Sequence, residues 1–101
     1  MNTEQLIIEA KARFNLNSAK QYLKEKYESK FQVAEQNGLW KADIQTISFL
    51  SSFDTATIVV VDIFGNPVLV NRKELLDKLS LVYQSVTNEW YNEFSSLENR
   101  R

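Results

Sequence analysis

Residues 59–76, VVVDIFGNPVLVNRKELL, decide the fold. Two apolar runs flank Gly65 and Asn66, and the second run leads into the start of a helix. Glycine at the first central position suits a type II′ hairpin, but Pro67 disfavours the conformation that Asn66 would need there. A tight hairpin and a hairpin with a wider loop therefore both fit. A phosphate-binding loop is the weaker interpretation, because such loops use several glycines with a lysine or helix start directly after them.

A long helix follows this hairpin over residues 72–97. Asn71 is suited to cap it, because its side chain can accept from a backbone N–H, and Glu74 complements the helix dipole. The helix is about 39 Å long at 1.5 Å per residue, whereas a strand spans about 17–20 Å. A small sheet cannot cover such a helix. Its second half must pack against either the N-terminal helical segments or another subunit.

The far end of this helix carries the candidate interface. Tyrosine and tryptophan bring large contact area at low entropic cost, so they are favoured at interfaces. Packing within the chain and packing against a second copy are about equally favoured. Stacking of single-stranded nucleic acid is disfavoured, because Glu89 and Glu93 repel phosphate. The candidate interface residues are Tyr83, Trp90, Tyr91, Phe94 and Leu97.

The N-terminal third predicts helical structure. A helical stripe over residues 4–13 continues to Phe14, and Thr3 or Asn2 can cap its start. Asn15-Leu16-Asn17 interrupts the stripe, and residues 18–21 resemble a capping box that begins a second segment. A short helical hairpin and one kinked helix both fit. The stripe consists of Leu6, Ile7, Ala10 and Phe14.

The middle of the chain predicts two hairpins with a short helix between them. Asn37-Gly38 between alternating runs is a strong hairpin signal. Asp43 is suited to cap a helix over residues 44–52. The strand over residues 57–62 has an apolar run without alternation, which indicates a central strand covered on both faces. The short helix is expected to turn inward Ile44, Ile47, Phe49 and Leu50.

Together these elements predict one α+β domain over residues 1–101. N-terminal helical segments lead into a small antiparallel sheet of two hairpins, and a long C-terminal helix packs across it.

Composition excludes several classes of function. Twelve basic and 13 acidic residues give a net charge of −1, which argues against general nucleic-acid binding. The chain has no Cys and no His, so the usual nucleophiles, general bases and metal ligands are missing. Asp43, Asp54 and Asp62 are explained as a helix cap and turn residues. We expect no enzyme activity, no catalytic residues, no cofactor, no metal and no membrane segment, with a cytoplasmic location as the default.

Residues 39–97 resemble an uncharacterised small domain of tailed bacteriophages, found in tail-fibre-associated and tail-assembly proteins. The matching features are Trp40, the Ala42-Asp43 pair, the short helix, the strand, the Asp62–Gly65 turn and the terminal helix. The resemblance implies a non-enzymatic phage accessory protein that acts through protein contacts in virion or tail assembly. Its partner would be itself, as a homo-oligomer, or another phage protein, in the host cytoplasm or the virion. The alternative is a small phage-encoded inhibitor or regulator that binds a host protein.

Overall fold

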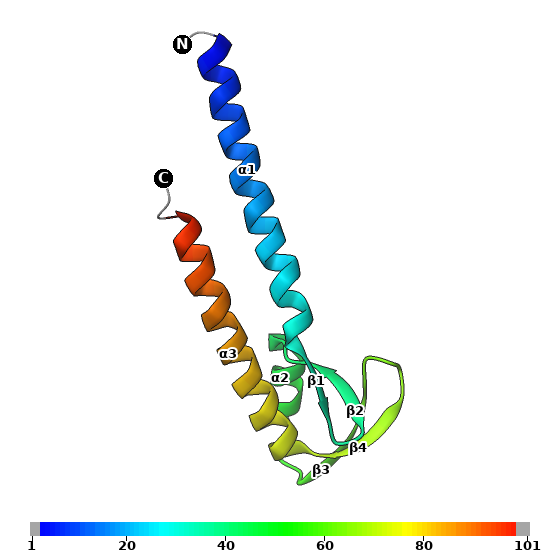
Figure 1. Cartoon of the computed structure of the whole chain (residues 1–101). Coiled ribbons are helices and arrows are strands. Elements are labelled where there is room, and N and C mark those ends of the chain that lie inside the picture. The colour runs from blue at the N-terminus through cyan, green and yellow to red at the C-terminus, as the bar shows by residue number, and fades with distance from the viewer. Residues whose placement is uncertain (1–2, 99–101) are drawn as a thin grey trace.

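The structure is a computed structural model that describes residues 3–98, except for the side chains of residues 9, 10 and 98. It measures 65 × 24 × 20 Å. A head of two hairpins and a short helix lies at one end, and two long antiparallel helices form a stalk (Figure 1). In chain order the elements are α1 (Thr3–Glu28), the 3-10 helix η1 (Ser29–Phe31), β1 (Gln32–Glu35), β2 (Gly38–Lys41), α2 (Ile44–Ser51), β3 (Thr57–Val61), β4 (Pro67–Asn71) and α3 (Arg72–Glu98). This arrangement confirms the α+β class.

The long C-terminal helix is confirmed, and so is its cap. The backbone N–H of Glu74 donates to the Asn71 side-chain oxygen over 3.1 Å. Helix α3 packs against both α1 and α2 and touches β1 and β4. It therefore connects the head to the stalk.

The N-terminal segments form one uninterrupted helix, so of the two predicted alternatives the single helix is present and the helical hairpin is wrong. Asn15 and Asn17 lie inside α1. Asparagine costs a helix interior no more than about 0.7 kcal/mol, which good helix formers on both sides offset. The box beginning at Ser18 caps nothing, because the residues before it stay helical. Thr3 is the first described helical residue, and the proposed cap at Asn2 lies outside the described residues.

The first hairpin is confirmed, but its turn lies one residue earlier than predicted. Glu35 pairs with Gly38, so the central turn residues are Gln36 and Asn37, with φ of 48° and 64°. Gly38 instead makes room for Trp40, since a Cβ at residue 38 would lie 2.5 Å from Cζ2 of that indole. The indole Nε1 donates to the Glu35 carbonyl over 2.7 Å.

The second hairpin has the wider of the two predicted connections. Val61 pairs with Pro67, which leaves a five-residue loop over residues 62–66 in which Gly65 has a φ of 83°. The prediction of a central strand is wrong, because β3 pairs with β4 alone in a two-stranded sheet. Val59 and Val61 face outward and are 59% and 62% exposed.

The two hairpins are separate sheets that Asp62 joins. Its carboxylate accepts from the backbone N–H of Leu39 over 3.2 Å and of Asn66 over 3.0 Å. The N–H of Ile63 also donates to the Leu39 carbonyl over 2.9 Å. The backbone N–H groups of Asn66, first, and of Leu39 hold the pKa of Asp62 below its ordinary value. Asp62 is therefore a turn residue, as predicted.

Helix α2 has the predicted cap but buries only one side. The N–H of Thr46 donates to Asp43 Oδ1 over 2.8 Å. Leu50 is fully buried and Ile47 packs on the core, whereas Ile44 and Phe49 are 62% and 46% exposed. The inward orientation predicted for those two is wrong, because a short helix that packs on one neighbour buries a single stripe.

The core begins at Leu23 and runs through both hairpins into α3. Its buried apolar members are Leu23, Tyr27, Phe31, Val33, Trp40, Ala42, Leu50, Val70, Leu75, Leu79 and Val86.

Candidate protein-interaction surfaces

The second half of α3 meets α1 of the same chain. Tyr83, Trp90, Phe94 and Leu97 are partly buried and pack against the core, whereas Tyr91 is 69% exposed. The sequence left open whether these side chains pack within the chain or against a second copy. In the structure the four partly buried side chains pack within the chain.

Aromatic contacts tie the two stalk helices together. The rings of Tyr27 and Trp90 stack with their centroids 6.2 Å apart and their planes within 8°. The Lys20 ammonium lies 5.1 Å from the centroid of Phe94, a cation–π distance. Nearer the head, the Phe31 and Tyr83 rings lie 5.9 Å apart.

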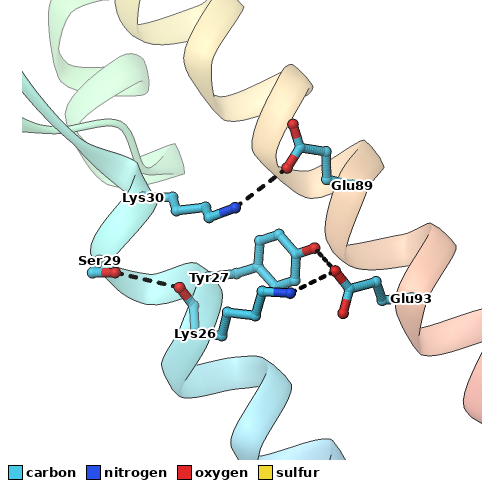
Figure 2. Close-up of polar contacts among 6 residues, drawn as sticks. All are labelled: Lys26, Tyr27, Ser29, Lys30, Glu89 and Glu93. Carbon is cyan, nitrogen blue, oxygen red and sulfur yellow. Dashed lines mark hydrogen bonds and ion pairs between the residues drawn. The ribbon is translucent and has the colours of Figure 1, made fainter.

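Glu93 is the centre of a polar cluster on the same interface (Figure 2). Lys26 Nζ lies 2.7 Å from Glu93 Oε1, and the Tyr27 hydroxyl donates to the same oxygen. Lys30 Nζ lies 3.6 Å from Glu89 Oε2 one turn away. These contacts join the end of α1 and η1 to α3.

The pKa values of this cluster follow from its hydrogen bonds. The bond from Lys26, then that from Tyr27, lowers the pKa of Glu93. The bond to Glu93 raises the pKa of Lys26 and is the main cause of the raised pKa of Tyr27. All three groups therefore keep their neutral-pH charge states, and the Tyr27 hydroxyl is a poor general base.

Residues 3–98 hold no cluster of three or more carboxylates that could bind a metal ion. A polar hollow of about 510 Å³ lies at the start of α3. Its Arg72 guanidinium donates to the carbonyls of Thr55 and Leu50, and its Asn71 caps the helix. The Arg72 and Asn71 side chains in this hollow thus stabilise the fold.

The first exposed apolar surface lies on the β3–β4 hairpin, and we call it the hairpin face. Its residues alternate outward along the two strands and continue into the loop between them. A groove of about 290 Å³ between α2 and β3 adjoins it, with Trp40 and Phe49 in its lining. The hairpin face consists of Val59 (59% exposed), Val61 (62%), Ile63 (47%), Phe64 (73%) and Leu69 (67%).

The second exposed apolar surface is residues 3–17, which we call the α1 extension. Leu97 of the last turn of α3 shares a hollow with Ala19 and Leu23, so α3 ends beside that part of α1. The rest of α1 continues alone past that end (Figure 1). Leu6, Ile7, Ile8 and Phe14 are 54%, 49%, 66% and 69% exposed.

The sequence contained the signal for this extension, because the apolar stripe near the N-terminus was one of the two predicted partners of the C-terminal helix. The predicted stripe of Leu6, Ile7 and Phe14 is present on α1, and the described residues do not bury it. Ala10 belongs to the same stripe by its spacing, but its side chain lies outside the described residues. Chain length alone did not reveal that α1 overshoots its partner helix.

Comparison with protein-family models, with curated proteins and with solved structures found no match. The resemblance to a phage tail domain therefore stays a prediction. None of the helices within residues 3–98 combines the length and the apolar character needed to cross a membrane.

Proposed function

We propose that this chain is a non-enzymatic assembly protein that binds another protein through the hairpin face. One observation supports this proposal most strongly. On the outward side of β3 and β4, Val59 and Leu69 pair across the strands and are both exposed. An antiparallel sheet with one solvated side usually places polar residues there. Contiguous apolar patches on monomeric proteins often mark interaction sites.

The backbone at the free edge of β3 adds to this surface. The Arg72 N–H donates to Ala56 O, and the Asp62 N–H donates to Asn66 O. The even-numbered residues of β3 therefore form their backbone hydrogen bonds with β4. The backbone N–H and C=O groups of Thr57, Val59 and Val61 face the open edge of the strand. An extended segment of a partner can add there as a further strand while its side chains enter the groove beside α2.

The resemblance to a phage tail domain supplies the class of partner. A protein of the phage virion or tail is the proposed occupant, and the role is assembly. The geometry supports binding, while the phage setting rests on the resemblance.

Affinity capture from infected cells tests this proposal, with a matched pair of variants. Leu69 and Leu81 are both 67% exposed, but Leu81 lies on α3, away from the hairpin face. The wild type and Leu81→Lys should capture a virion protein, identified by mass spectrometry, that Leu69→Lys loses. Dependence on Leu69 for a host protein instead would favour the inhibitor or regulator. A set of captured proteins that Leu69→Lys leaves unchanged would contradict the proposal.

A further inference from the structure

We propose that the α1 extension pairs with the α1 extension of a second copy, antiparallel, about a two-fold axis between residues 8 and 9. This dimer goes beyond the proposed function, because it uses the opposite end of the molecule from the hairpin face (Figure 1). The two surfaces are therefore separable by experiment.

The extension has a seam with helical spacing that is apolar after its first residue, Thr3. Thr3, Ile7, position 10 and Phe14 follow one another at intervals of four, three and four residues, as in a coiled-coil seam. Leu6 lies beside the seam. The half-exposed Ile7 and the largely exposed Phe14 have no partner among the described residues that buries them.

This seam is its own complement when a second copy runs in the opposite direction. Residue 7 then lies opposite position 10 of the second copy, and residue 3 lies opposite residue 14. A two-fold axis repeats each contact, as an isologous interface requires. Every apolar position of the seam thereby gains cover from a single kind of partner.

The charges flanking the seam select this pairing. Glu4 and Lys11 are exposed and lie seven residues apart on the same side of the helix. Antiparallel pairing places Glu4 of each copy beside Lys11 of the other, which makes two opposite-charge pairs. Parallel pairing would place Glu4 and Lys11 of the two copies on opposite sides of the seam, so neither of these opposite-charge pairs would form. The extension is therefore complementary in charge to a second antiparallel copy.

The size of the seam predicts a weak dimer. Fifteen residues at 1.5 Å each give about 22 Å, or roughly four turns. That is less than a standard stable interface, so we expect a dissociation constant in the micromolar range rather than the nanomolar range. The dimer carries its two hairpin faces at opposite ends, so it can link two partner molecules.

A charge-swap experiment tests the pairing on the full chain. Glu4→Lys sets the introduced lysine beside Lys11 of the second copy, and Lys11→Glu sets two glutamates together. Each single variant should self-associate about three- to tenfold more weakly at low salt, as judged by sedimentation equilibrium, because two attractive pairs become repulsive. An equimolar mixture of the two variants should restore wild-type association as a heterodimer. The double variant should restore it as a homodimer.

This design separates pairing from an effect on the helix alone. The lysine introduced by Glu4→Lys also opposes the dipole at the start of α1, but mixing with a second protein does not relieve that intrachain effect. Ile7→Lys, which places a charge in the seam, should abolish association, while Leu81→Lys should leave it unchanged. Circular dichroism should show equal helicity in the monomers of all variants except for fraying near residue 4.

Two results would overturn the inference. One is a wild-type chain that stays monomeric at several hundred micromolar. The other is a mixture of Glu4→Lys and Lys11→Glu that associates no better than either variant alone. Either result leaves the hairpin face untouched, because Leu69-dependent capture is measured separately.

Discussion

The two halves of α1 belong to one helix and differ in what covers them. In the second half, α3 buries Leu23 and Tyr27 to 5% and 2% exposure. In the first half, Leu6 and Phe14 remain 54% and 69% exposed. The contrast shows that apolar spacing predicts a helix and a buried stripe but does not say which chain supplies the cover. In this structure α3 covers α1 only as far as the position where α3 ends.

Replacing one large apolar side chain in each half of α1 with alanine should give the largest difference, measured as the change in the free energy of unfolding. Leu23→Ala removes a buried side chain, and we expect it to lower the free energy of unfolding by about 2–5 kcal/mol. Ile7→Ala in the dilute monomer should change it by no more than about 0.5 kcal/mol, because that side chain is half-exposed. Urea unfolding at low micromolar concentration measures both values. Equal losses would show that the extension is covered within one chain.

Acid should weaken the contact between the second half of α1 and α3. The folded pKa of Glu93 is lowered, so its contribution to stability is present above the unfolded value of about 4.3 and is lost as pH falls through the folded value. In Glu93→Gln this loss should be absent, and the acid side of the stability curve should be flatter. Unfolding measured from about pH 6 to pH 3 checks this.

Asp62 provides the internal control for this pH series. Its pKa is also lowered, by backbone N–H donors in the head. Glu93→Gln should therefore keep the part of the acid dependence that Asp62 supplies. A curve as steep as that of the wild type would show that Lys26 and Tyr27 do not stabilise the charged form of Glu93.

The smallest expected effect is a difference in amide hydrogen-exchange rates between the two halves of α1. In dilute protein the amides of the extension should exchange faster than those of residues 18–28, because no packed neighbour holds that part of the helix. Raising the concentration should slow exchange in the extension and leave residues 18–28 unchanged. Concentration-independent exchange along all of α1 would argue against self-pairing.

The parts of the fold that sequence predicted are those with local causes. The caps at Asn71 and Asp43 and the extent of α3 follow from neighbouring residues, and the structure has them. The position of the first turn was missed, because the Asn-Gly signal favours those two residues as the centre of a turn, and the pattern does not show that the Trp40 indole lies against Gly38. The continuity of α1 was left open, since two asparagines and a capping pattern are weak evidence for a break when helix-forming residues lie on both sides.

The candidate surface was predicted less well, for a physical reason. Both alternatives for Tyr83, Trp90 and Phe94 obeyed the same helical spacing, and the choice between them depended on where α1 lies. An unbroken apolar run in β3 usually means a strand covered on both faces, yet Val59 and Val61 remain exposed. In a sequence, an apolar run that is exposed in the structure has the same pattern as a run that is buried in the core.

A distance between two copies tests the central claim, that a second antiparallel copy covers the α1 extension. The chain has no Cys, so Ser18→Cys allows a single spin label just beyond the extension. Antiparallel pairing about the axis between residues 8 and 9 places the two labelled sites about 30 Å apart, from 1.5 Å per residue along the axis and a helix separation of 8–10 Å. Double electron–electron resonance at high micromolar concentration should give a peak near that distance. A peak at about 10–15 Å, as parallel pairing predicts, or no defined intermolecular distance would contradict the account.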